Sequence, residues 1–158
     1  MKRLIIGAFI VASVGMMLSA CAMEETAMPA DQSKLQIRTG VYRGECFGYC
    51  REEMTVTRSR LVHKKVAYPP DVTQPDIVKE QAIKVAEWNA LVKNLDLDAF
   101  WRLPRMIGEP DAADQGGEWV EITRGDKTKR VDFEAEARIP EIEMFLERLR
   151  KLRRDISQ

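Results

Sequence analysis

Residues 35–68 read LQIRTGVYRGECFGYCREEMTVTRSRLVHKKVAY, and this stretch decides the fold. Apolar and polar side chains alternate from Leu35 to near Cys46, a pattern typical of a strand with one buried face. The alternation returns in EMTVTR at 53–58 and in LVHKKVAY at 61–68, so the stretch predicts three strands. Two prolines follow directly and end this part of the sheet, because proline cannot donate a hydrogen bond to a neighbouring strand.

The rest of the chain predicts a helix, a hairpin and a second helix. Apolar residues recur at three and four positions over 83–95, which favours a helix, although IVKEQAI at 77–83 could be extended before it. A glycine-containing connection at 124–127 separates two apolar runs, which predicts a hairpin. The last segment, 139–155, combines helical apolar spacing with acids near its start and bases near its end. We therefore expect an α+β fold: an antiparallel sheet of about three strands and a two-strand hairpin, with helices on one face.

The composition is that of a globular protein. The chain has 158 residues, with 25 basic and 25 acidic side chains and 45% hydrophobic residues. This length is enough for one hydrophobic core, so we expect a single globular domain over 35–158. The amino-terminal part holds Lys2 and Arg3 and no acid before Cys21, so the remainder is slightly acidic. That balance argues against a nucleic-acid partner, because such proteins carry an excess of basic side chains.

Residues 1–20 have the pattern of a bacterial signal peptide. Two basic residues precede an apolar run at 4–18 that is too short to cross a bilayer comfortably. The run ends in LSAC at 18–21, which resembles the lipobox of bacterial lipoproteins. The resemblance implies that Cys21 carries a thioether-linked diacylglycerol and an amide-linked fatty acid such as palmitate, and that it anchors the protein in a membrane. The alternative is an ordinary secretory signal cut near the same position, which would leave a soluble periplasmic protein.

The residues that follow Cys21 predict the target membrane and a tether. By the same resemblance, an aspartate directly after the lipidated cysteine would retain a lipoprotein in the inner membrane. Ala22 occupies that position, so we expect attachment to the outer membrane, facing the periplasm, with an inner-membrane anchor as the alternative. Small, polar and acidic residues dominate 21–34, and this composition predicts a flexible tether.

Two further cysteines, Cys46 and Cys50, bracket the tripeptide FGY. Their spacing favours a disulfide, since exported proteins fold in an oxidising compartment and Gly48 supplies the backbone freedom that a short ring requires. A thiol–disulfide redox pair and a zinc site are the alternatives, but redox motifs usually have two intervening residues and structural zinc needs four ligands. The single histidine, His63, is expected to point to solvent because it alternates with Val62.

An acidic, glycine-rich segment before the predicted hairpin is a candidate functional loop. Its candidate residues are Asp111, Asp114, Glu118 and Trp119. The carboxylates could bind a cation, but their spacing differs from that of a calcium loop, and a turn built from Asp and Gly is the simpler interpretation. The tryptophan could line a ligand groove or belong to the core. Likewise, the basic run at 148–154 could contact anionic lipid or form the solvated side of the last helix. No catalytic residue, metal ligand set or cofactor is predicted.

Three short motifs lie along the predicted domain: CFGYC at 46–50, EWNAL at 87–91 and GEPDAADQGGEW at 108–119. Together they resemble a family of small bacterial exported domains of unknown function, over about 35–155. The resemblance implies no catalytic residue. Relatives commonly carry a proline after the second cysteine, where this chain has Arg51. Some also carry a second cysteine pair, where this chain has Glu109 and Ala112, so a role for such a pair does not transfer.

The sequence thus favours a non-enzymatic binding or interaction module of the bacterial envelope. It would be anchored to the membrane through Cys21 and would contact an envelope protein partner. No phosphate loop, nucleophile elbow or zincin motif is present that would indicate an enzyme. Two alternatives use Cys46 and Cys50: a periplasmic enzyme inhibitor that presents their loop to an active site, and a thiol–disulfide redox protein.

Overall fold

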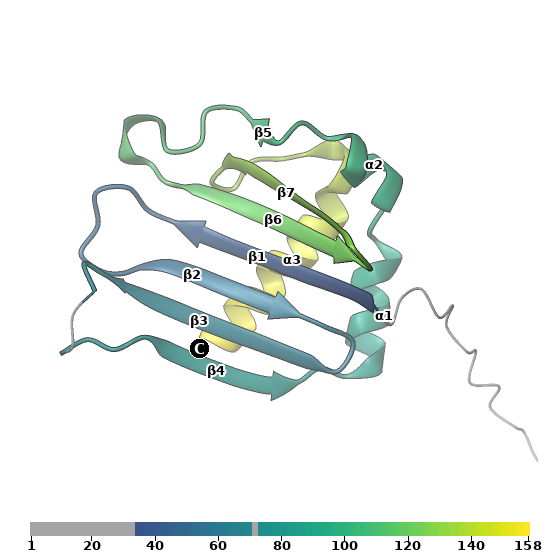
Figure 1. Ribbon diagram of the computed structural model, residues 1–158, viewed down its shortest axis with the longest axis horizontal. Coiled ribbons are helices and arrows are strands. Elements are labelled where there is room, and N and C mark those ends of the chain that lie inside the picture. Colours follow the sequence, from purple (N-terminus) through teal and green to yellow (C-terminus); the bar gives the residue numbers. More distant parts are fainter. Residues whose placement is uncertain (1–33, 71–72) are drawn as a thin grey trace, which may run out of the picture.

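The computed structural model describes residues 34–70 and 73–158, which form one sheet covered on one side by helices (Figure 1). The predicted signal peptide, Cys21 and the tether except for Lys34 lie outside the described residues. The strands are β1 (Leu35–Tyr42), β2 (Gly48–Val56), β3 (Arg60–Tyr68), β4 (Ile77–Ala82), β5 (Met106–Ile107), β6 (Gly117–Arg124) and β7 (Lys127–Glu134). The helices are α1 (Val85–Lys93), α2 (Leu97–Arg102) and α3 (Glu143–Ser157), with short 3-10 turns η2 (Ala112–Asp114) and η3 (Pro140–Ile142).

The predicted antiparallel sheet of about three strands and a hairpin is wrong. The sheet has seven strands in the order β4-β3-β2-β1-β6-β7-β5. It is mixed, because β5 runs parallel to β7 whereas the other neighbours pair antiparallel. The alternative that 77–83 is extended is confirmed for Ile77–Ala82, which form β4. Alternation does not reveal this strand, because it is an edge strand whose side chains are largely exposed on both faces. β5 has only two residues, too few to show any period.

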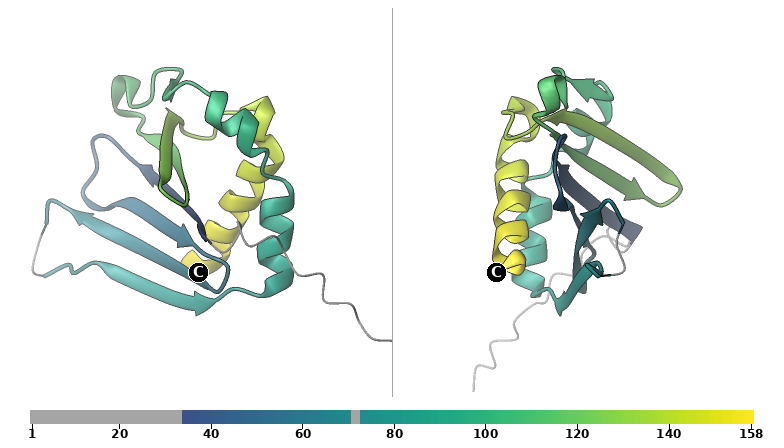
Figure 2. Two further views of the ribbon diagram at one scale, coloured as in Figure 1. Left: turned by 45° about the vertical axis from the view of Figure 1, so that its right-hand side comes forward. Right: turned by 90° about the vertical axis from the view of Figure 1, so that its left-hand side faces the viewer.

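The register of the central strand β1 separates the two faces of the sheet. Leu35, Ile37 and Thr39 are buried on the face covered by α1 and α3 (Figure 2). The alternate residues, among them Arg38 and Tyr42, project from the opposite face, because successive side chains of a strand point in opposite directions. Within the described part of the chain, no helix covers this second face, here named the open face.

Helix α3 closes the core because its apolar stripe faces the sheet. Phe145, Leu149 and Ile156 follow helical spacing and are all buried. Trp88 of α1 and Phe100 of α2 are fully buried in the same cluster. Complete burial of one such side chain stabilises a fold by about 1.5–3 kcal/mol. The helices are therefore fixed to the sheet mainly by these large side chains.

His63 faces the helices, so the prediction that it points to solvent is wrong. It pairs with Met54 in the register of β3 and β2, and both residues are buried on the helix-covered face. The Nε2 atom of His63 lies 3.4 Å from Oε2 of Glu52, and its Nδ1 has no hydrogen-bond partner among the described residues. Burial lowers the pKa of His63 below its ordinary value of 6.5, and the contact with Glu52 opposes only part of this shift.

Stability should therefore decline as the pH falls below about 6.5. In that range the unfolded chain takes up a proton at His63 that the folded chain resists, so acid favours unfolding until the lowered folded pKa is passed. Urea unfolding midpoints measured between about pH 7.5 and 5.5 test this prediction. In His63→Gln the midpoint should vary less, because the sequence contains 1 histidine. Parallel pH profiles for the two proteins would contradict it.

Candidate functional site

A disulfide-closed loop presents a phenylalanine at one end of the sheet. The Sγ atoms of Cys46 and Cys50 lie 2.13 Å apart, at the disulfide-bonding distance that their spacing predicted. Gly48 adopts a φ of +92° inside this ring, a conformation that other residues rarely reach. Phe47 is 91% exposed. Its aromatic surface is therefore available to another molecule.

The loop is attached to its surroundings at its carboxyl side. The hydroxyl of Tyr49 donates a hydrogen bond to the carbonyl oxygen of Pro75 at 2.9 Å. The pairing of β2 with β3 shifts between Tyr49 and Arg51, so Cys50 is the extra residue of a β-bulge. Cys50 is buried, whereas Arg51 is exposed. The bulge and the disulfide together set the direction in which β2 presents Arg51.

Two aromatic rings lie against glycines of the neighbouring strand on the open face. The register pairs Gly40 with Trp119 and Tyr42 with Gly117. A Cβ added to Gly40 would lie 2.7 Å from atoms of the Trp119 ring, and one added to Gly117 would lie 2.5 Å from the Tyr42 hydroxyl. The two glycines are therefore required for the rings to lie close to the sheet.

Arginine side chains cover Trp119. The guanidinium of Arg130 lies 4.2 Å from the ring centroid and that of Arg38 lies 5.6 Å from it. Asp132 accepts hydrogen bonds of 2.6–3.1 Å from Arg130, and Glu121 accepts one of 2.9 Å from Arg38. Trp119 is consequently buried even though it projects from the open face.

Two hollows meet at the end of the open face that carries the disulfide loop. They measure about 290 Å³ and about 310 Å³, and Tyr42 and Arg51 line both. The first is also lined by Val41, Glu53, Trp119 and Arg130. The second is also lined by Arg43, Gly44, Cys50, Tyr68 and Asp111. Because both hollows are lined by Tyr42 and Arg51, they lie next to each other, and the pair is here named the Arg51 trough.

The structure does not bring the four candidate loop residues together. Asp111 and Asp114 are exposed in the connection before β6, and Oδ1 of Asp111 accepts a hydrogen bond from the amide of Gly116 at 3.2 Å. Glu118 and Trp119 are successive residues of β6, so their side chains project from opposite faces. This geometry favours the turn interpretation of the loop. In the residues that the structure describes, no group of three or more His, Cys, Asp or Glu side chains could hold a metal ion.

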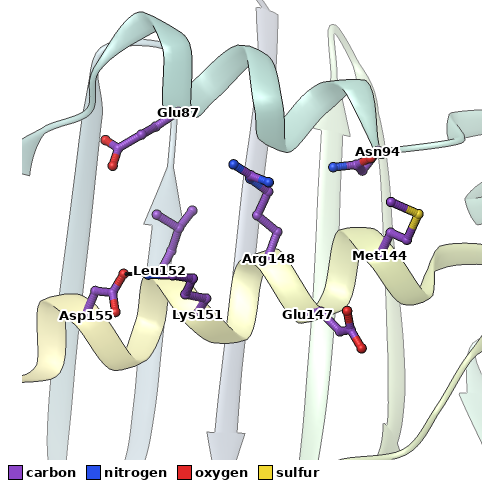
Figure 3. A pocket seen from close by; sticks show the side chains of 8 residues that line it. All are labelled: Glu87, Asn94, Met144, Glu147, Arg148, Lys151, Leu152 and Asp155. Atoms are coloured by element: carbon purple, nitrogen blue, oxygen red, sulfur yellow. Dashed lines mark hydrogen bonds and ion pairs between the residues drawn. The ribbon is translucent and has the colours of Figure 1, made fainter.

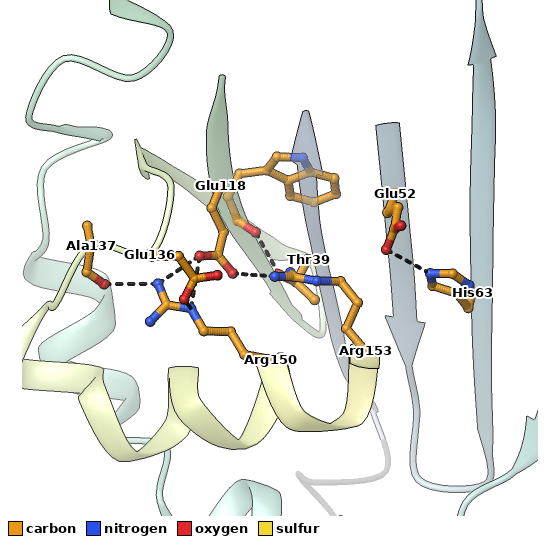
Figure 4. Close-up of polar contacts among 9 residues, drawn as sticks. Thr39, Glu52, His63, Glu118, Glu136, Ala137, Arg150 and Arg153 are labelled. Atoms are coloured by element: carbon orange, nitrogen blue, oxygen red, sulfur yellow. Dashed lines mark hydrogen bonds and ion pairs between the residues drawn. The ribbon is translucent and has the colours of Figure 1, made fainter. Parts of the chain in front are cut away.

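Glu118 lies beneath α3, between two buried arginines (Figure 4). Its Oε2 accepts hydrogen bonds from Nε and Nη2 of Arg150 at 2.9 and 2.7 Å, and its Oε1 accepts one from Nη2 of Arg153 at 2.9 Å. Arg153 also contacts the hydroxyl of Thr39 at 3.4 Å, and Arg150 donates to the carbonyl of Ala137 at 2.9 Å. The basic run of the last helix, interpreted from the sequence as solvated or lipid-facing, thus supplies two buried side chains that join α3 to β6.

A larger hollow of about 410 Å³ lies between α1 and α3 (Figure 3). Charged side chains of both signs line it, among them Glu87, Arg148 and Lys151. Lys151 is paired with Asp155 at 2.6 Å. The balanced charges indicate a solvated seam between two helices and do not define a ligand.

The structure places Tyr42, Phe47, Arg51 and Tyr68 at the same end of the sheet, and none of the four is among the candidate functional residues predicted from the sequence. One signal was available for Phe47: it lies between two cysteines whose spacing predicts a disulfide, which places it on a short closed loop. No comparable signal exists for Tyr42 and Arg51, because their proximity depends on the register of β1 and β2.

No protein-family model matches this chain, and no curated protein matches it. The resemblance to small exported domains therefore stays a prediction. Among the helices that the structure describes, none has the length and apolar character needed to cross a membrane.

Proposed function

We propose that this chain is a lipid-anchored binding module of the bacterial envelope that holds a protein partner through Phe47. The observation that carries the proposal is the 91% exposure of a phenylalanine on a disulfide-closed loop. Aromatic side chains supply much of the binding energy of protein interfaces, and a loop fixed in advance loses less entropy on binding. Phe47 therefore suits an anchor that inserts into an apolar pocket.

The surroundings of Phe47 indicate the chemistry of the partner. Tyr68 is 54% exposed and pairs with Gly48, so it lies beside the loop. Arg43 and Arg51 are exposed, and neither guanidinium has an ion-pair partner among the described residues. We expect an apolar pocket with acidic groups at its rim, because such a rim would complement both cations.

The membrane anchor at Cys21 is supported by the resemblance of residues 18–21 to a lipobox. The position at which the tether joins the domain supports a protein partner. β1 has 8 residues and begins directly after Lys34, and the Phe47 loop follows its other end (Figure 1). A strand of this length spans about 26 Å, so Lys34 and the Phe47 loop lie at opposite ends of β1. This arrangement favours a protein partner for Phe47 over the membrane that holds the anchor.

The protein partner could be an envelope enzyme whose active-site cleft has an apolar pocket. The inhibitor alternative, in which the loop enters an active-site cleft, would use the same Phe47 contact. In the redox alternative, thiol–disulfide exchange would have to begin at Cys46, which is partly exposed, because Cys50 is buried and exchange requires attack on an accessible sulfur.

Photo-crosslinking in cells that produce the full chain tests the proposal. A photoreactive phenylalanine analogue at position 47 should give one discrete protein adduct, because a side chain that is held in a pocket of one partner can react only with that protein. The adduct should carry incorporated palmitate, since Cys21 and Phe47 belong to the same molecule. The matched control places the analogue at Val85, which is 58% exposed at the start of α1, and should not give this adduct.

The two parts of the proposal fail separately. If positions 47 and 85 give the same products, or if only lipid is crosslinked at position 47, the protein partner is overturned. If the adduct forms without palmitate and Cys21→Ala leaves membrane fractionation unchanged, the anchor is overturned. Replacing Cys46 and Cys50 together with serine should lower the yield of adduct at position 47, because the loop is then no longer fixed.

A further inference from the structure

Arg51 differs from two other arginines on the open face. Arg38 lies 2.9 Å from Glu121 and Arg130 lies 2.6 Å from Asp132, so both of those guanidinium groups are paired. The guanidinium of Arg51 has no hydrogen-bond or ion-pair partner in the part of the chain that the structure describes. A guanidinium presents two parallel N–H groups, which match the two oxygens of a carboxylate.

The position of Arg51 is fixed by its neighbours. It lies opposite Tyr42 in the register of β1 and β2, and the bulge and disulfide at Cys50 directly precede it. The Tyr42 hydroxyl also has no acceptor among the described residues. Burial, with Asp132 and Asp111 nearby, raises the pKa of Tyr42, so its hydroxyl stays a donor. Two donors from adjacent strands therefore line one trough without an acceptor.

The charges around the trough suit a ligand with a single negative group. Glu53 lines the first hollow and Asp111 the second, and Glu121 and Asp132 lie on the strands beside them. A ligand with many negative charges, such as an acidic polysaccharide, would be repelled by these carboxylates, whereas a ligand with one negative charge can pair with Arg51 alone. The second hollow continues from Arg51 to Tyr68, which leaves room for uncharged atoms behind the anionic group.

We propose that the Arg51 trough binds the terminal carboxylate of a peptide. Arg51 and Tyr42 donate to the carboxylate oxygens, and the preceding residue of the peptide lies in the second hollow toward Tyr68. Chain-end carboxylates are recognised elsewhere by convergent donors beside a pocket for the last side chains. Arg51 belongs both to this site and to the surroundings of Phe47, but Phe47 lines neither hollow, so dipeptide binding can be tested without the Phe47 contact.

Calorimetric titration of the purified full chain tests the proposal with a matched pair of probes. Acetyl-Tyr-Ala with a free carboxylate should bind at least about tenfold more tightly than the same dipeptide as its amide. Arg51→Gln should weaken binding of the acid by about tenfold or more, and Arg51→Lys, which keeps the charge without the fork, by less. The control is Arg58→Gln, an equal loss of charge in the exposed turn after β2, and it should bind like the unaltered chain.

Each other outcome overturns the proposal. Equal affinity for the acid and the amide, or equal effects of Arg51→Gln and Arg58→Gln, would exclude a carboxylate site at Arg51. Acetate or inorganic phosphate binding as tightly as the dipeptide acid would show a site for free small anions and not for a chain end. Absence of binding at about 10 mM dipeptide, where a Kd of about 1 mM gives clear saturation, would exclude the site altogether. The acid–amide comparison needs no variant, so a folding defect cannot obscure it.

Discussion

Replacing Glu118 with alanine should lower the free energy of unfolding by about 3–5 kcal/mol. The side chain is 1% exposed and accepts hydrogen bonds from both Arg150 and Arg153. Its removal leaves two guanidinium groups beneath α3, with the hydroxyl of Thr39 and the carbonyl of Ala137 as their neutral acceptors. Among the described residues, the exposed carboxylate of Glu136 would still lie 3.9 Å from Arg150, whereas Arg153 would keep no ion-pair partner. The loss arises mainly from burying these charges with so little compensation, because a buried charge is strongly unfavourable unless it is paired.

Denaturant unfolding of the full chain measures this effect, and Glu121→Ala provides the control. Glu121 lies on the same strand and binds Arg38 at 2.9 Å, but this pair is partly exposed on the open face. Exposed ion pairs contribute about 0.2–1 kcal/mol, so Glu121→Ala should be nearly as stable as the unaltered chain. Equal losses for the two variants would show that burial beneath α3 does not determine the energetics of Glu118.

Alternation in the sequence could predict the strands that have one face in the core, and it could not predict the edges of the sheet. β1, β3 and β7 each bury mainly one face, so a period of two is visible in them. β6 departs from this pattern, because its first four residues are all buried. β4 has a neighbour on one side only and buries little. The pairing of β5 with β7 depends on where the chain returns after α2, which no local pattern records.

The partners of charged side chains also lay beyond prediction from the sequence. Glu118 is separated by 32 residues from Arg150 and by 35 from Arg153, and charged residues are ordinarily exposed. The helical spacing at 139–155 therefore predicted the apolar stripe of the last helix. It did not predict that Arg150 and Arg153 are buried on the same side of that helix. Cys46 and Cys50 are separated by only 4 positions, so their pairing is a local geometric matter and was accessible to prediction.

Gly116→Ala should destabilise the fold by about 2–5 kcal/mol. Gly116 has a φ of +78°, which an alanine adopts only with strain. A Cβ at this position would lie 2.0 Å from the carbonyl oxygen of Tyr42 and 2.7 Å from the Cα of Arg43. Both contacts are with backbone, so they can be relieved only by displacing the end of β1. Thermal and denaturant unfolding measure the loss.

Gly125→Ala separates the two causes of this loss. Gly125 has a φ of +64° with nothing within 4 Å of an added Cβ, so its replacement should cost only the left-handed conformation, about 1–2 kcal/mol. The difference between the variants then reports the close contact with β1. Because Tyr42 and Arg43 line the Arg51 trough, Gly116→Ala should also weaken dipeptide binding where it remains folded, whereas Gly125→Ala should bind normally. Equal stability of the two variants would show that the end of β1 yields freely, and a trough built on it would then not be formed in advance of its ligand.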